Sequence, residues 1–355
     1  MPWVSHGIFL SICFWLVFAV LGLLFGRDFI ALFTDVPAVV DMGAGYVTVV
    51  TTASCGVFLL FVAERLMQAT GNTVYHMVTL LNCVLDPILI FGLFGCPALG
   101  TTGAALATVL SQITAMSIGF FINVRFNRDV RIHVRGFRPD VRILAEIVRI
   151  GLPAALQQSL LSVLTVGLNR ILMPFSQTAV GFYGVYYKLQ NFLFMPVYGL
   201  NNALIPMIGF NYGAKNRRRI ERITRYALLL ALGIMAAGTL LFEALPVPLL
   251  RLFDASDAML ALGVPAIRII SASFCLAGVS VILSGCMQGL GRGSESLIVA
   301  LLRQLVLLLP AAVLLSHVSL SALWLAFPLA EACGLAAAVL LHRRVCRRLL
   351  SGSSE

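Results

Sequence analysis

Apolar residues occur along this chain in long runs that are separated by short polar connectors. Each run approaches the roughly 20 residues that a helix needs to cross the hydrocarbon core of a bilayer. The runs do not alternate between apolar and polar positions, so they do not fit the strands of a membrane barrel. The pattern predicts about ten transmembrane helices. These lie near 6–26, 44–67, 77–96, 101–123, 150–170, 178–208, 225–246, 264–287, 297–316 and 319–341.

Two segments of the chain, 31–75 and 251–295, resemble each other without gaps. Transporters commonly enclose a central site between structural repeats, so this similarity favours a transporter built from two related bundles. The offset between the copies leaves the first part of the second bundle, about seventy residues, without a counterpart in the first. The matched identities are Leu32/Leu252, Phe33/Phe253, Ala38/Ala258, Gly43/Gly263, Cys55/Cys275, Met67/Met287, Gln68/Gln288 and Gly71/Gly291.

The composition agrees with a membrane protein. The chain is 60% hydrophobic and 11% charged, whereas soluble domains carry about 25% charged residues. Its net charge of +10 comes mainly from the connectors 124–149 and 209–225 and from the tail after 342, whereas the alternate connectors carry aspartates. By the positive-inside rule, the basic connectors and the C-terminus are expected in the cytoplasm. We therefore expect a multi-pass membrane protein whose partners include lipids and exclude nucleic acid.

Sequence motifs for catalysis are absent. There is no nucleophile elbow, His–Glu zinc motif or phosphate loop. The eight cysteines show no paired metal spacing and mostly lie inside apolar runs, where cysteine behaves as a small hydrophobic residue. The sequence predicts no enzyme, no metal site and no cofactor.

Six phrases along the chain together resemble the multidrug and toxic compound extrusion (MATE) family. They are MQATGNT (67–73), NCVLDPILIF (82–91), LGTTGAALAT (99–108), GLPAALQQ (151–158), MPVYGL (195–200) and PMIGFNYGAKN (206–216). The resemblance implies twelve spans in two bundles of six, a place in the cell (inner) membrane, and the exchange of Na⁺ or H⁺ for an organic cation or drug. This chain lacks counterparts of the first two family spans, the first of which carries a cation-binding acid in many members.

The expected fold is therefore an all-α membrane protein with about ten transmembrane helices in two related bundles. The first bundle has four of its six helices, and the second has all six. The resemblance and the charge pattern divide the chain into four parts. They are an incomplete N-terminal bundle corresponding to family spans 3–6 (1–124), a basic cytoplasmic linker (125–149), a six-helix bundle (150–342) and a cytoplasmic tail (343–355).

Two acidic residues inside predicted spans are the candidates for cation or proton coupling. A charge at the centre of a span costs about 2.5–3.5 kcal/mol, so such a residue is a candidate site by default. Glu331 either serves coupling or makes a hydrogen bond between helices. Asp86 precedes Pro87, which removes a backbone donor, so Asp86 either binds a cation or ties down freed backbone. Arg303 lies near a span end, where we expect its side chain to extend to the interface.

Polar residues inside the second bundle are the candidates for lining a substrate cavity. Tyr183, Tyr187 and Asn191 share one helical face, and aromatic faces attract organic cations by about 0.5–2 kcal/mol. The same tyrosines also fit an interfacial aromatic belt. Lys188 would repel a cationic substrate unless it is paired or neutral. The candidates are Gln157, Gln158, Asn169, Tyr183, Tyr187, Lys188 and Asn191.

These features predict a secondary active antiporter that exports cationic or amphipathic organic compounds in exchange for Na⁺ or H⁺. Two alternatives stay open. One is a flippase of lipid-linked oligosaccharides, which has a related architecture and needs a basic cavity for a diphosphate. The other is a truncated membrane protein without transport activity.

Overall fold

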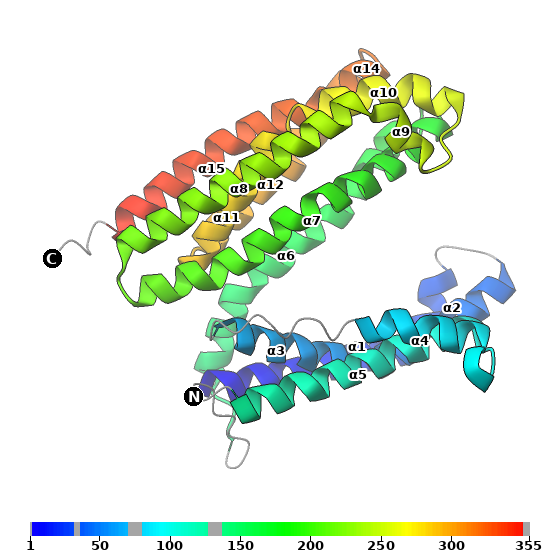
Figure 1. Ribbon diagram of the computed structural model, residues 1–355, viewed down its shortest axis with the longest axis vertical. Coiled ribbons are helices and arrows are strands. Elements are labelled where there is room, and N and C mark those ends of the chain that lie inside the picture. The colour runs from blue at the N-terminus through cyan, green and yellow to red at the C-terminus, as the bar shows by residue number, and fades with distance from the viewer. Residues whose placement is uncertain (1, 32–35, 70–79, 127–136, 351–355) are drawn as a thin grey trace. The chain divides into compact units, whose positions relative to one another are not determined.

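A computed structural model describes residues 2–31, 36–69, 80–126 and 137–350 (Figure 1). The chain forms two compact units, 1–148 and 149–355, and each is described by itself. The described residues form helices and no strands, so the prediction of an all-α fold is confirmed.

The first unit is a small bundle in which α5 packs against three neighbours. α5 contacts α2, α3 and α4, and α1 contacts α2 and α3. The Trp15 indole of α1 donates a hydrogen bond of 2.9 Å to the Thr52 carbonyl at the end of α2. The elements are α1 (Pro2–Ala31), α2 (Pro37–Thr52), α3 (Cys55–Ala69), α4 (Leu80–Phe91), the 3-10 turn η2 (Leu93–Gly95) and α5 (Gly100–Phe126).

The helix α6 (Val141–Leu172) leads into the second unit, in which α11 is central. α11 packs against α7, α8, α12 and α15. Several helices begin at a side-chain cap, and the Ser176, Asn216 and Ser319 side chains each accept a hydrogen bond from the first turn. The elements after α6 are α7 (Gln177–Gly213), α8 (Arg217–Ala244), α9 (Pro246–Arg251), α10 (Asp257–Ser271), α11 (Phe274–Gly289), α12 (Gly293–Leu301), the π-helical η3 (Leu302–Leu308), α13 (Leu309–Ser316), α14 (Leu320–Leu323) and α15 (Ala326–Leu350).

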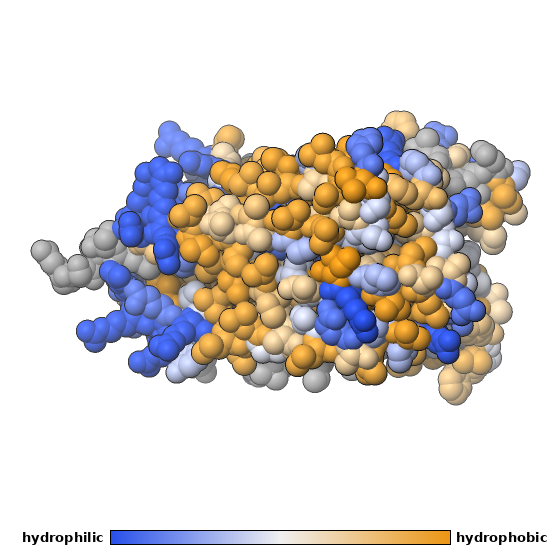
Figure 2. All heavy atoms as spheres, turned by 90° about the horizontal axis from the view of Figure 1, so that it is seen from above, coloured by the Kyte–Doolittle hydropathy of each residue, from blue (hydrophilic) through white to orange (hydrophobic). Residues whose placement is uncertain are grey.

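The described residues contain seven helices that are long and apolar enough to cross a membrane, or up to nine if each bent helix pair is one span. The expected number was about ten. The difference lies at the predicted span 77–96, where the described part contributes only the shorter apolar helix Leu81–Phe91. Figure 2 shows apolar side chains over the middle of the visible face and hydrophilic ones gathered at the end where α15 finishes.

Both units contain a pair of helices joined at a sharp bend. α2 and α3 meet at 45°, and α10 and α11 meet at 47°. At the bends, the Ser54 hydroxyl donates to the Thr51 carbonyl and the Ser273 hydroxyl donates to the Ile270 carbonyl, each at 2.7 Å. A serine that bonds back to its own helix competes with the backbone ladder and favours a bend. The internal repeat of the sequence is therefore also a repeat of structure.

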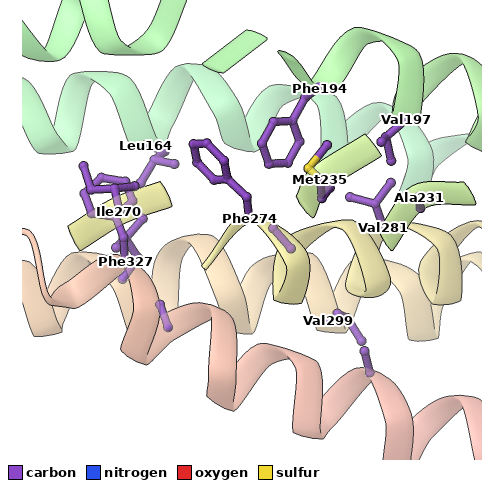
Figure 3. Packing of buried hydrophobic residues seen from close by; sticks show 14 of the residues in the cluster. Leu164, Phe194, Val197, Ala231, Met235, Ile270, Phe274, Val281, Val299 and Phe327 are labelled. Carbon is purple, nitrogen blue, oxygen red and sulfur yellow. The ribbon is translucent and has the colours of Figure 1, made fainter. Parts of the chain in front are cut away.

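The core of the second unit forms around Phe274, at the start of α11 (Figure 3). Its ring meets Phe194 of α7 edge-on at 5.5 Å between centroids, and it meets Phe242 of α8 in the same way at 5.3 Å. Edge-to-face geometry is the favoured arrangement of aromatic pairs. These contacts fix α11 between α7 and α8.

Parts of several sequence predictions lie outside the described residues. They are the repeat identities Leu32, Phe33 and Gly71, the end of the phrase 67–73, the start of the span 77–96, residues 127–136 of the basic linker and residues 351–355 of the tail. α6 begins at Val141, so the last residues of the predicted linker form its first turns. α15 continues to Leu350, so the described part of the predicted tail is helical.

Candidate functional site

The acid Glu331 of α15 lies beside Arg303 of η3 inside the second unit. The Glu331 Oε2 is 3.5 Å from the Arg303 Nη1, and the two side chains are 19% and 14% exposed. The sequence-based expectation that Arg303 extends to the interface was wrong, because its guanidinium turns inward toward a carboxylate. Removing one member of a buried ion pair strongly destabilises a protein, since the remaining charge is left without a partner.

The backbone around Arg303 departs from the α-helix. Residues Leu302–Leu308 are π-helical, and Pro310 follows in the first turn of α13. Proline has no N–H to donate, so the ladder of helical hydrogen bonds is interrupted just where the π turns end. Short π segments inside α-helices frequently occur at functional sites.

Several buried polar atoms around this pair have no hydrogen-bond partner within the described part of the chain. They are the Glu331 Oε2, the Arg303 Nε and the Tyr186 hydroxyl. The Glu331 carboxylate also acts electrostatically on the phenols of Tyr186 and Tyr198, both on α7. Buried polar atoms are normally paired, so each of these unpaired atoms calls for an explanation, and a functional role is one.

The second acid candidate, Asp86, belongs to the first unit. It accepts a hydrogen bond of 3.2 Å from the Asn82 side-chain amide, one turn earlier on α4. This bond lies within one helix and leaves the carboxylate partly buried beside Pro87. The structure therefore places Glu331 and Asp86 in different units.

Gln157 takes part in a polar network that joins three helices. The Gln288 side-chain amide of α11 donates to the Gln157 Oε1 of α6 at 3.0 Å and to the Ser296 hydroxyl of α12 at 2.9 Å. The neighbouring Gln158 is exposed. Gln288 is one of the repeat identities, which was the available sequence signal for its importance.

The predicted polar face of α7 is divided between core and surface. Tyr183 is buried, and its ring lies 6.4 Å from that of the half-buried Tyr187. Lys188 is exposed, with its Nζ 5.9 Å from the centre of the Phe253 ring. Asn191 and Asn169 are partly buried. Sequence reasoning missed Arg303 and Tyr198 as neighbours of Glu331, because that arrangement depends on how α7, η3 and α15 pack.

No group of three His, Cys, Asp or Glu side chains suited to a metal ion occurs among the described residues. The Glu331 cluster instead offers one carboxylate, one guanidinium and two phenols. Such a set can hold a proton or a monovalent cation on the carboxylate, and it can present aromatic surface to an organic cation.

Comparison with known proteins gives consistent matches. A family model described as MatE matches residues 3–90 and 153–314. The multidrug export protein MepA of Staphylococcus aureus is 25% identical over 346 residues, which cover 95% of this chain and 75% of the relative. MepA of Staphylococcus haemolyticus is 26% identical over 312 residues, covering 86% of this chain and 67% of the relative.

Solved structures share the fold. A MATE crystal structure in the bent conformation superposes with a TM-score of 0.90 at 23% identity, covering 99% of this chain and 79% of that one. A MOP superfamily transporter from Pyrococcus furiosus, described as having a binding pocket of reverse polarity, gives 0.87 at 23% identity. That match covers 100% of this chain and 79% of the other.

Proposed function

This chain belongs to the MATE family of multidrug efflux transporters, and from that premise we propose that it exports cationic or amphipathic organic compounds in exchange for Na⁺ or H⁺. Its relatives are multidrug transporters of bacteria, which indicates a multi-pass protein of a cell membrane. None of the relatives named above is an enzyme. The basic connectors and the basic end of α15 support a cytoplasmic C-terminus, by the positive-inside rule.

The observation that carries the coupling mechanism is the Glu331–Arg303 pair. In the resting state, Arg303 neutralises Glu331 as an internal counter-ion at 3.5 Å. The Glu331 Oε2 makes no hydrogen bond to any described residue. An arriving proton or Na⁺ therefore competes with Arg303 for this oxygen without having to break a hydrogen bond. A positively charged substrate competes for the same negative charge. Ligands that exclude each other at one site are coupled, and the coupling is reciprocal.

The tyrosines of α7 support binding of the organic cation. Tyr198 is exposed and lies within the electrostatic reach of Glu331, and Tyr187 of the same helix is half-buried, whereas Tyr183 and Tyr186 are buried in the core. Each aromatic ring that faces a desolvated cation contributes up to about 2 kcal/mol. Gln157 has a different place in this proposal, because its amide oxygen already joins α6 to α11.

Ethidium efflux tests this function in a bacterial host that lacks its own multidrug pumps. Cells that express the chain should expel the dye when energised, and Glu331→Gln should lower the initial rate at least tenfold. Glu243→Gln is the matched control, since Glu243 forms an ion pair of 3.8 Å with Arg268 but is 40% exposed. An absence of efflux by the wild type despite normal membrane insertion would overturn drug export. The alternative of a chain without transport activity predicts this same absence.

Membrane vesicles separate the two coupling ions. Efflux is measured once with a pH gradient alone and once with a Na⁺ gradient alone. The ion whose gradient drives uptake of dye into inverted vesicles is the coupling ion, and Glu331→Gln should abolish that response. Wild-type rates in this variant at every pH and Na⁺ concentration would remove Glu331 from the coupling mechanism.

A flippase of lipid-linked oligosaccharides is the second candidate, and Lys188 is its basic residue, although one lysine falls short of the broadly basic cavity that a diphosphate needs. This lysine is exposed on α7, where its ammonium group can meet a diphosphate. Under this alternative, the purified chain binds a polyprenyl diphosphate, Lys188→Gln weakens that binding, and dye efflux is absent. Drug export instead predicts that dye is expelled and that no polyprenyl diphosphate binds.

A further inference from the structure

A cavity of about 600 Å³ lies between α8 and α15, with α11 at its base. It is found at the end of the second unit where α8 begins and α15 finishes, which is the hydrophilic end of the face in Figure 2. Neither the Glu331 cluster nor the Gln157 network contributes to its lining. The cavity is therefore separate from the proposed transport site, and its interpretation does not depend on that proposal.

The rim of the cavity has an excess of positive charge. Four arginines line it, Arg217 and Arg225 from α8 and Arg343 and Arg347 from α15. Glu221 is the one acidic residue in the lining, and it accepts a hydrogen bond of 2.8 Å from the Nε of Arg217. Arginines placed on two facing helices are suited to holding a phosphate between them, because each guanidinium presents several donors in a fixed plane.

The polar groups at the floor of the cavity already have hydrogen-bond partners within the protein. Thr224 and Cys286 are buried there, and the Thr224 hydroxyl donates to the Ile220 carbonyl at 2.9 Å. The same hydroxyl oxygen lies 3.5 Å from the Cys286 Sγ. These polar groups are already satisfied, so the recognition of a ligand falls to the arginines at the rim.

The wall of the cavity toward the centre of the membrane helices is apolar. Leu228 and Leu229 follow Arg225 on α8, and Leu229 is 57% exposed. The cavity thus changes from cationic to apolar within about one turn of α8. A ligand that matches both parts carries a negative headgroup joined to hydrocarbon.

We propose that this cavity binds an anionic phospholipid, with its phosphate between the arginines of α8 and α15 and an acyl chain along Leu228 and Leu229. A soluble phosphate would satisfy the arginines but would leave the leucine wall uncovered. The cytoplasmic leaflet is the anionic one, so the positive-inside orientation of the chain brings this end to the matching lipid. A lipid held there bridges α8 and α15 across α11.

The first experiment measures lipid binding to the purified full chain in detergent by native mass spectrometry. Phosphatidylglycerol, phosphatidylcholine and glycerol 3-phosphate are compared. We expect retained phosphatidylglycerol, little phosphatidylcholine and no glycerol 3-phosphate. The double variant R225Q/R343Q should bind phosphatidylglycerol about tenfold more weakly, since each arginine near an anionic surface contributes a several-fold factor.

The matched control is R222Q/R344Q, which also removes one arginine from α8 and one from α15. Arg222 and Arg344 are exposed and are not part of the cavity lining. Unchanged lipid affinity in the control supports the proposal. An equal loss in both double variants would show diffuse attraction instead of a site, and no loss in R225Q/R343Q would also overturn it. Equal binding of glycerol 3-phosphate would mean a soluble anion site.

A second measurement uses the wild-type chain, so its outcome does not depend on whether a variant folds. Cys346 of α15 lines the cavity, whereas Cys333 of the same helix is exposed and lies outside the lining. Phosphatidylglycerol should slow maleimide labelling of Cys346 several-fold and leave the rate at Cys333 unchanged. Equal rates at Cys346 with and without the anionic lipid would contradict occupation of the cavity.

Discussion

Gly334 of α15 gives the side chain of Arg303 the space to reach the interior: a Cβ at this glycine would lie 2.9 Å from the Arg303 Cγ. Gly334 is three residues after Glu331, so both residues are on the same side of α15. The aliphatic stem of Arg303 therefore crosses α15 at the glycine, close to the carboxylate that the guanidinium meets. The geometry of the ion pair depends on a missing side chain.

Gly334→Ala should accordingly displace Arg303 and weaken its pairing with Glu331. We expect the variant to lose about 1–3 kcal/mol of stability, the usual cost of overpacking, and to lose most dye efflux. Thermal unfolding in detergent and ethidium efflux are the measurements. Gly233→Ala on α8 is the control, since a Cβ there meets no atom within 4 Å. Normal efflux and stability in Gly334→Ala would show that the crossing has no role.

Removing one member of the ion pair should cost more stability than removing both. Arg303→Met leaves the Glu331 carboxylate buried without its counter-charge, a change that costs about 3–5 kcal/mol in buried pairs. The double variant Arg303→Met/Glu331→Gln should regain much of that stability, yet it should remain inactive because no carboxylate is present. Recovery of both stability and efflux in the double variant would assign the pair a structural role alone.

Gln288 should matter for the packing of three helices. Gln288→Ala leaves the Gln157 amide oxygen and the Ser296 hydroxyl without their shared donor, at an expected cost of about 1–3 kcal/mol. Gln158→Ala, at the exposed neighbouring position, should change stability by less than about 0.5 kcal/mol. Melting temperatures of the two purified variants provide the comparison. Equal values would mean that the network contributes nothing.

Gly285 and Asn201 should form a suppressor pair. Gly285 of α11 faces the Asn201 side chain of α7 so closely that a Cβ would collide with its amide oxygen. Gly285→Ala alone should therefore destabilise the contact between α7 and α11. Adding Asn201→Ala removes the obstructing amide and should restore the melting temperature. A double-mutant cycle measures this coupling, and additive effects of the two changes would contradict the contact.

The helices were predictable because a span must be long and apolar, and the sequence shows that directly. The bends inside two of the spans were not predicted. Ser54 and Ser273 look like small residues in apolar runs, and the hydrogen bonds that they make to Thr51 and Ile270 depend on local backbone geometry. The two serines lie one position out of register in the repeat, since Ser54 aligns with Phe274, so the repeat alone did not mark them.

The surroundings of the candidate site were harder to predict than Glu331 itself. An acid in the middle of a span is unusual enough to be noticed in sequence. Its neighbours come from other helices, and distance along the chain says nothing about which side of a helix faces inward. Arg303 is the clear case, because it lies near a predicted span end and yet its guanidinium meets Glu331 inside the structure.

A π-helical turn holds more residues than an α-helical one, whose successive side chains are set about 100° apart. The chain from Leu302 to Leu308 consequently shifts the phase of everything that follows. Side chains of α13 point in directions that an unbroken α-helix would not give them, while those of α12 keep theirs. A single hydrophobic stripe drawn along this span on a helical wheel would thus be misaligned at one of its two ends.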